Sequence, residues 1–183
     1  MPVRPYLVIV SGAPGAGKTT LALRLARELA LPLLTKDDVK EAIADVIDAK
    51  DRDESRRIGL AAYGVLYAVA ARLLDAGTGL VLESNFERGR AEERLAPLVA
   101  KSRAVIVQCE VPEAVALERY KTRAASGTRH AVHKDEVVIE AWSRGIKSDH
   151  SSLELGIPVI PVDTSDGYRP ALDEIVAALR GPA

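Results

Sequence analysis

The sequence has few of the features that mark secreted or membrane proteins. Cys109 is its only cysteine, so no disulfide can form within the chain, which fits a reducing compartment. The longest stretch without a charged residue, 58–71, has 14 residues, whereas a transmembrane helix needs about 20. Residues 1–10 are too short for a secretory signal and run directly into a glycine-rich segment. We therefore expect a cytoplasmic protein without a membrane partner.

The sequence also lacks an excess of positive charge. Its 25 lysine and arginine residues are balanced by 26 aspartate and glutamate residues, which gives a net charge of −1. This balance leaves no broad basic surface, so we expect no nucleic-acid partner. Apolar residues make up 48 % of the 183 residues, enough for a single domain over 1–183 with its own core. Monomer and homodimer both stay open.

Short apolar runs alternate with longer amphipathic segments along the chain. The runs are typical of strands buried on both faces and cover 6–10, 31–34, 80–82, 104–109 and 158–162. The segments between them predict helices at 18–30, 39–49, 58–74, 90–100, 112–125, 135–147 and 170–179. Such an alternation predicts an α/β fold, with a parallel sheet covered by helices on both faces.

The segment after the first expected strand matches the phosphate-binding P-loop at every fixed position of G-x-x-x-x-G-K-[ST]. Its glycines let the backbone wrap around phosphates, and the helix that follows turns its positive N-terminal end toward the anion. The lysine reaches the β- and γ-phosphates, and the threonine hydroxyl binds Mg²⁺. We therefore predict binding of ATP and Mg²⁺ by Gly12, Ala13, Pro14, Gly15, Ala16, Gly17, Lys18, Thr19 and Thr20.

Other residues narrow the class of P-loop protein. The chain lacks the Asn-Lys-x-Asp motif with which GTPases read the base, and Glu83 and Ser84 stand where AAA-type motors have an Asp-Glu pair. Asp37 directly follows the second expected strand, at the sheet edge where ligands bind in open α/β folds. With the small size of the chain, this carboxylate favours a phosphotransferase. Alternatively, Asp37 could serve only as the N-cap of the next helix.

The chain resembles the small P-loop kinases, and within them the AAA-type ATP-binding bacterial kinases, which are similar to zeta-toxin, chloramphenicol phosphotransferase and polynucleotide-kinase-like enzymes. The resemblance spans nearly the whole chain. It implies a three-layer P-loop fold with strand order 2-3-1-4-5 and a helical lid over about 119–135. Besides the P-loop, it rests on Leu34-Thr35-Lys36-Asp37, Leu82-Glu83-Ser84-Asn85-Phe86, Arg119 with Arg123, and Pro161-Val162-Asp163-Thr164.

The resemblance implies catalytic and metal-binding roles. Asp37 would orient or deprotonate the acceptor hydroxyl, and Thr19 and Glu83 would hold Mg²⁺, the glutamate directly or through water. Lys18, Arg119 and Arg123 would stabilise the transferring phosphoryl group. The two arginines are four residues apart and share a helix face, so they could instead be solvated and paired with Glu118 or Asp135.

The remaining assignments concern the nucleotide base and the acceptor. Asp163 and Thr164 follow the last expected strand, where the resembled kinases hold adenine, and Arg119 would also contact the nucleotide. Asp37, Asn85, Phe86 and Arg129 would bind the acceptor. Asn85 could instead form a turn, and Phe86, the only phenylalanine, could instead pack in the core.

These features predict a kinase that transfers the γ-phosphate of Mg-ATP to a hydroxyl of a small molecule, such as an antibiotic, sugar, nucleoside or metabolite. A second hypothesis is a P-loop ATPase or nucleotide-binding module that acts through a protein partner. A kinase of nucleic-acid ends is disfavoured by the charge balance.

Overall fold

The structure is a computed structural model that describes residues 4–127, 129–146 and 148–181. Its centre is a five-stranded sheet in the order β2-β3-β1-β4-β5, and every strand pair is parallel. This confirms the fold class and the strand order expected from the sequence. The strands are β1 (Tyr6–Gly12), β2 (Leu33–Thr35), β3 (Leu80–Glu83), β4 (Arg103–Glu110) and β5 (Val159–Asp163).

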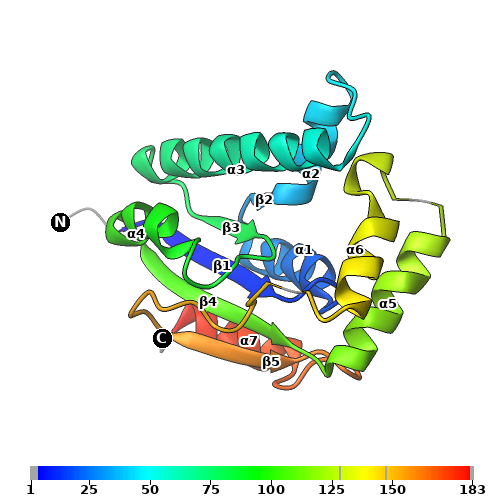
Figure 1. Ribbon diagram of the computed structural model, residues 1–183. Coiled ribbons are helices and arrows are strands. Elements are labelled where there is room, and N and C mark those ends of the chain that lie inside the picture. The colour runs from blue at the N-terminus through cyan, green and yellow to red at the C-terminus, as the bar shows by residue number, and fades with distance from the viewer. Residues whose placement is uncertain (1–3, 128, 147, 182–183) are drawn as a thin grey trace.

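Helices cover both faces of the sheet (Figure 1). The helices are α1 (Lys18–Leu29), α2 (Lys36–Ala44), α3 (Arg52–Asp75), α4 (Glu92–Lys101), α5 (Glu113–Ala125), α6 (Asp135–Ser143) and α7 (Leu172–Arg180), with a 3₁₀ turn η1 (Ala131–His133) between α5 and α6. The arrowheads of the strands point toward α5 and α6, so these two helices stand beside the carboxyl end of the sheet (Figure 1).

Alternate residues of the strands supply two separate cores, as the two-residue period of a strand requires. On β1, Val8 and Val10 belong to the core that includes α1 and α7. Leu7 and Ile9 belong to the opposite core, which includes α3 and α4. Both sets are fully buried, so the central strand has no polar face, and this explains why it reads as a continuous apolar run.

The register of the strands places the ends of the inner strands together. Val10 of β1 pairs with Glu83 at the end of β3, and Thr35 at the end of β2 pairs with the same Glu83. Gly12, which ends β1, pairs with Cys109 of β4. The residues that follow these strands therefore share one edge of the sheet, where ligands bind in open α/β folds.

Three helices differ from the sequence prediction by four or more residues at one end. α2 ends at Ala44 instead of 49, and it begins at Lys36 instead of 39. α3 begins at Arg52 instead of 58, because the carboxylate of Asp51 accepts a hydrogen bond from the backbone N–H of Glu54 at 2.9 Å and caps the helix. α6 ends at Ser143, because Gly145 takes a left-handed conformation with φ of 74° just beyond it. The last residue predicted for that helix, Lys147, lies outside the described residues.

The middle of the outer face of α3 is apolar. Leu60, Val65 and Val69 expose 65 %, 45 % and 39 % of their surfaces. By length and composition alone, α3 is the one helix of the described chain that could cross a membrane, a test that the core helices of soluble proteins also pass. On its inner face, Leu66 and Ala70 are fully buried against the sheet.

The structure corrects one site assignment. Phe86 was a candidate for the acceptor pocket, but its side chain is fully buried in the core beneath α3 and α4. Its ring lies 6.3 Å from that of Tyr63, measured between centroids. The alternative of a core residue is therefore the right one, because a side chain with no exposed surface cannot contact a substrate.

The burial of Phe86 predicts a large effect on stability. Phe86→Ala is expected to lower the free energy of unfolding by about 3–5 kcal/mol, since it removes a fully buried ring and leaves a cavity. Urea denaturation would measure this change. Val65→Ala on the exposed face of α3 is the control and should stay within about 0.5 kcal/mol of the wild type. Equal effects of the two substitutions would contradict the placement of Phe86.

Candidate active site

The P-loop links the end of β1 to α1 through glycines that no other residue can replace without strain. Gly15 and Gly17 have φ of 79° and 73°, in the left-handed region. A Cβ atom on Gly15 would lie 2.1 Å from the carbonyl oxygen of Ala116, and one on Gly12 would lie 2.4 Å from that of Cys109. The loop therefore follows its tight path because its glycines allow contact with the backbone of β4 and α5.

The N-terminus of α1 is open to an anion. Gly17 precedes the helix and provides no side-chain cap, and the first turn contains no acidic residue. The first backbone N–H groups of a helix have no partner within the helix and carry partial positive charge. A phosphate at this position would accept hydrogen bonds from them, as at other helix N-termini.

Lys18 places a positive charge in the interior. Its side chain is only 8 % exposed, and its ammonium group donates a hydrogen bond to the carbonyl oxygen of Ala13 at 2.8 Å. Burial lowers the pKa of Lys18, an effect that the negative charge of Glu83 partly offsets. Among the residues that the structure describes, no carboxylate lies within ion-pair distance of this ammonium group. A bound phosphate would supply the missing negative charge.

Thr19 and Glu83 form the part of the site that fits Mg²⁺. The Thr19 hydroxyl donates a hydrogen bond to the carboxylate of Glu83 at 3.1 Å. Glu83 is 5 % exposed, and its burial raises its pKa although Lys18 acts in the opposite direction. A hydroxyl and a carboxylate are hard oxygen ligands, which Mg²⁺ prefers, and it commonly keeps several waters when it also binds phosphates. The two side chains therefore fit a magnesium ion bound with the nucleotide.

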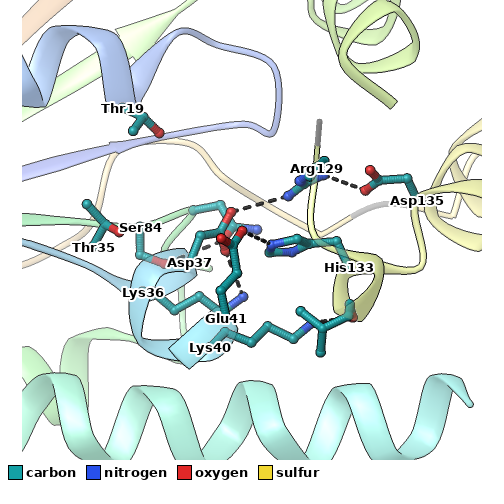
Figure 2. Close-up of polar contacts among 12 residues, drawn as sticks. Thr19, Thr35, Lys36, Asp37, Lys40, Glu41, Ser84, Arg129, His133 and Asp135 are labelled. Atoms are coloured by element: carbon teal, nitrogen blue, oxygen red, sulfur yellow. Dashed lines mark hydrogen bonds and ion pairs between the residues drawn. The ribbon is translucent and has the colours of Figure 1, made fainter. Parts of the chain in front are cut away.

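Asp37 does not cap α2. The N-cap of α2 is Thr35, whose hydroxyl oxygen accepts a hydrogen bond from the backbone N–H of Asp38 at 3.0 Å. The carboxylate of Asp37 instead lies 3.1 Å from the ammonium group of Lys36 and 3.2 Å from the guanidinium group of Arg129. Figure 2 shows Asp37 pointing away from its own helix toward Arg129. The alternative that Asp37 is only a helix cap is therefore wrong.

Neighbouring positive charges keep Asp37 ionised. Partial burial of the carboxylate would raise its pKa, but the charges of Lys36 and Arg129, with the hydrogen bond from Lys36, hold the pKa well below its ordinary value. The side chain is still 43 % exposed, so a ligand bound beside it could reach its oxygen atoms. Asp37 thus presents a permanent negative charge with accessible oxygen atoms.

Residues 129–134, which precede α6, lie against α2 (Figure 2). Arg129 connects the two sides, because it pairs with Asp37 of α2 and also with Asp135 at the start of α6. Nε2 of His133 lies 2.7 Å from the carboxylate of Glu41. Burial lowers the pKa of His133, so we assign this contact as a hydrogen bond from a neutral imidazole and not as an ion pair. These contacts hold residues 129–135 against α2, and Arg129 and His133 line the cavity described below.

The two arginines of α5, Arg119 and Arg123, contact different groups. The guanidinium group of Arg119 donates hydrogen bonds to the carbonyl oxygens of Thr164 and Ser165, at 2.9 and 2.7 Å. That of Arg123 lies 5.3 Å from the centre of the Tyr120 ring. Neither forms an ion pair with Glu118 or Asp135 within the described ranges. Arg119 therefore faces the loop after β5, whereas Arg123 contacts the ring of Tyr120.

Asp163 and Thr164 support this edge of the site without lining it. The Thr164 hydroxyl donates to the carbonyl oxygen of Ala16 at 2.9 Å, which fastens the P-loop to the end of β5. The carboxylate of Asp163 accepts a hydrogen bond from the backbone N–H of Ser165 at 2.8 Å and shapes the loop. Thr164 is 4 % exposed, so contact with a nucleotide base would fall to backbone atoms near it.

One cavity of about 330 Å³ collects most of the predicted site residues. It brings P-loop residues together with groups from the ends of β2 and β3, from α5 and from the segment before α6. Six predicted site residues do not line it: Gly12, Ala13, Ala16, Phe86, Asp163 and Thr164. The predicted residues that do are Pro14, Gly15, Gly17, Lys18, Thr19, Thr20, Asp37, Glu83, Asn85, Arg119, Arg123 and Arg129.

A second cavity of about 530 Å³ adjoins the first, and the two share Lys36, Lys40 and Asn85. Lys40 was missed by the sequence analysis. Its side chain is buried at 6 % exposure, and its ammonium group donates to the hydroxyl of Ser55 at 2.9 Å and the carbonyl oxygen of Val132 at 3.1 Å. Its spacing of three residues from Asp37, on the same helix face, was the one available signal.

The fold and the site define a P-loop protein of the small-kinase type. The chain belongs to the AAA domain family, which matches residues 7–147. Its structure is similar to that of a candidate kinase from Chloroflexus aurantiacus j-10-fl, with 36 % sequence identity, a TM-score of 0.83 and 97 % of each chain covered. No curated protein matches the sequence.

More distant structures share the fold alone. A gluconokinase from Sinorhizobium meliloti 1021 is 16 % identical, with a TM-score of 0.57 and coverage of 97 % of this chain and 93 % of that one. A chain of the Pnkp1/Rnl/Hen1 RNA repair complex is 18 % identical, with the same TM-score of 0.57. There the match covers 85 % of this chain and 50 % of the other.

The ion pairs of Asp37 predict a pH-dependent stability. A carboxylate whose pKa is lowered on folding stabilises the folded state above its ordinary pKa of 3.8, and this contribution is lost as the pH falls from there toward the lowered pKa. Urea denaturation of the wild type and Asp37→Asn should therefore differ most above about pH 4, and the two should converge in more acidic solution. A difference that does not change with pH would contradict this account.

Proposed function

We propose that the protein is an ATP-dependent kinase that phosphorylates a hydroxyl group of a small molecule. The observation that supports this most directly is the position of Asp37. Its carboxylate and the P-loop residues Lys18 and Thr19 line one cavity, and a second cavity opens from it past Lys36 and Asn85. A nucleotide on the P-loop would thus direct its terminal phosphate toward a carboxylate and a separate acceptor space.

The nucleotide would occupy the first cavity. Its phosphates would lie against the P-loop backbone and the N-terminus of α1, with Lys18 neutralising their charge. Arg119 would lie toward the base, because it faces the loop after β5. Thr19 and Glu83 would hold Mg²⁺, which when bound neutralises negative charge on the β- and γ-phosphates.

In the proposed reaction, the acceptor hydroxyl oxygen forms a bond to the γ-phosphorus while the bond from that phosphorus to the oxygen bridging to the β-phosphate breaks. ADP leaves with the electron pair of the broken bond. The hydroxyl proton passes to the Asp37 carboxylate and then to solvent. Lys18 and Arg123 would stabilise the charge that spreads over the transferring group, so that positioning and electrostatics supply most of the rate enhancement.

The alternative is an ATPase or nucleotide-binding module that acts through a protein partner. It would hydrolyse ATP without any acceptor, and a protein would accelerate that hydrolysis. The kinase would instead transfer phosphate to a small molecule. A screen of hydroxyl-bearing metabolites and antibiotics by mass spectrometry, with ATP and Mg²⁺ present, distinguishes the two by a mass gain of one phosphoryl group.

The role of Asp37 predicts a specific loss of transfer. Asp37→Asn should reduce the rate of transfer to an acceptor found in that screen by about 10²- to 10⁴-fold, the usual effect of removing such a carboxylate. Its affinity for ATP should be nearly unchanged, because the P-loop is intact. Asp38→Asn is the matched control, since Asp38 does not line the cavity. Full transfer activity of Asp37→Asn would overturn the assigned role.

The role of Glu83 predicts a change in metal requirement. Glu83→Gln keeps the shape of the side chain but removes the charge that faces Thr19. The Mg²⁺ concentration for half-maximal turnover should rise about 10- to 100-fold, as for loss of other groups that orient a metal and its ligands. Titration of turnover with MgCl₂ at fixed ATP measures this. An unchanged midpoint would exclude Glu83 from the magnesium site.

A further inference from the structure

We propose that the acceptor carries a negatively charged group, a carboxylate or a phosphate, and that Arg56 and Arg94 bind it in the second cavity. This inference rests on the proposed kinase function and specifies its substrate class. The second cavity lies between α2, α3 and the start of α4, and its lining is rich in positive charge. Its charged residues are Lys36, Lys40, Arg56, Arg90 and Arg94, against the single carboxylate of Glu87.

The positive charge in this cavity exceeds what its neighbours neutralise. Lys36 pairs with Asp37 at 3.1 Å, and Arg90 pairs with Glu87 at 3.0 Å. Arg56 and Arg94 form no ion pair with any carboxylate of the described residues. The chain as a whole has a net charge of −1, so this excess is local to the cavity. A local excess of one sign in a concave site favours a ligand of the opposite sign.

Lys40 adds a third positive group without a carboxylate partner. Its hydrogen bonds go to a hydroxyl and a backbone carbonyl, both neutral acceptors. Burial and the nearby charge of Lys36 lower its pKa to about 8. Lys40 lines both cavities, between the catalytic carboxylate and the arginines of the second cavity. An anionic acceptor that spans the two cavities would thus lie close to positive charge in both of them.

The wall of the cavity is aromatic. Tyr63 and Tyr67 lie on one face of α3 with Arg56, and their rings are stacked with centroids 5.9 Å apart. The hydroxyl of Tyr63 lies 2.8 Å from that of Ser84, which fixes the ring beside the end of β3. The guanidinium group of Arg94 lies 5.8 Å from the centre of the Tyr67 ring. The wall therefore offers an apolar surface to the body of the acceptor and an arginine at its edge to the anion.

Carboxylate and phosphate share the chemistry that this arrangement recognises. A guanidinium group can donate two parallel hydrogen bonds to either anion, and Arg56 and Arg94 belong to different helices that face the same cavity. The hydroxyl to be phosphorylated would then extend past Lys36 toward Asp37. The acceptor is thus a hydroxyl compound with an anionic group at one end, which the two arginines hold away from the nucleotide.

Binding of simple probes tests the anion preference without catalysis. The probes are phenyl phosphate, benzoate and the neutral benzyl alcohol, titrated by ligand-observed NMR with a non-hydrolysable ATP analogue and Mg²⁺ present. At least one anionic probe should bind about ten-fold more tightly than benzyl alcohol, and the difference should shrink with added salt. The Arg56→Gln, Arg94→Gln double variant should lose it. Arg57→Gln, one residue away on the same helix and outside the cavity, should keep it.

Equal binding of the charged and neutral probes, or equal loss in the double variant and in Arg57→Gln, would overturn the inference. If phenyl phosphate and benzoate differ, the tighter one identifies the kind of anion. Because this measurement needs no turnover, it stands apart from the kinase proposal.

A transfer assay separates the two proposals. Pairs of hydroxyl compounds, one anionic and one neutral, would be offered with ATP and Mg²⁺. Both proposals are supported if phosphate is transferred to the anionic member of a pair and the KM for that compound rises about ten-fold in the double variant. The KM should be unchanged in Arg57→Gln. Transfer to neutral compounds that the double variant leaves unchanged overturns the anionic acceptor and keeps the kinase. Anion binding without transfer to any hydroxyl compound overturns the kinase and keeps the anion site.

Discussion

The site is organised around the buried ammonium group of Lys18. A charge removed from water is costly unless an opposite charge accompanies it, and within the described structure this one has a backbone carbonyl as its hydrogen-bond acceptor. The P-loop positions the group by following a path that only glycine allows, in contact with the backbone of β4 and α5. Glu83 acts on Lys18 from a distance and also accepts the Thr19 hydrogen bond. A polyphosphate with a bound Mg²⁺ would complement these groups, because its charge would pair with Lys18 while the metal would lie against Thr19 and Glu83.

An ion pair also connects residues 129–134 to α2, where Asp37 lies. Arg129 pairs with both Asp37 and Asp135, so residues 129–134 are tied to the first turn of α2. Lys40 reinforces this connection through the backbone of Val132. Because Asp37 also lines the cavity, an acceptor of the proposed kinase would compete with Arg129 for the same carboxylate. The ion pair between Arg129 and Asp37 therefore contributes both to the position of residues 129–134 and to the charge around Asp37, and in the proposed kinase acceptor binding would alter this contact.

The sequence predicted the features that local chemistry determines. Alternation of apolar runs and amphipathic helices identified the sheet and its layers, and the P-loop followed from the fixed spacing of glycines, lysine and threonine. The sequence did not predict contacts between segments that are far apart in the chain. Lys40 reads as an exposed helical lysine until Ser55 and Val132 are known to enclose it. Phe86 adjoins a predicted site residue, yet successive residues after a strand can face opposite ways, and only the packing of α3 shows that it is buried. Arg94 gave no sequence signal, because its place in the second cavity, and with it the role proposed above, comes from α4 lying beside α3.

The low pKa of Asp37 bears on how phosphoryl transfer would proceed. A carboxylate held ionised by Lys36 and Arg129 is a weak base, so it would take little of the hydroxyl proton before the bond to phosphorus forms. Phosphoryl transfer tolerates this, because its loose transition state leaves the hydroxyl oxygen with little positive charge until late in the reaction. The carboxylate then acts mainly by orientation: it accepts the hydroxyl hydrogen bond and directs an oxygen lone pair at phosphorus. An acceptor anchored at its far end by arginines suits such a site, since two fixed points define the approach of the hydroxyl better than one.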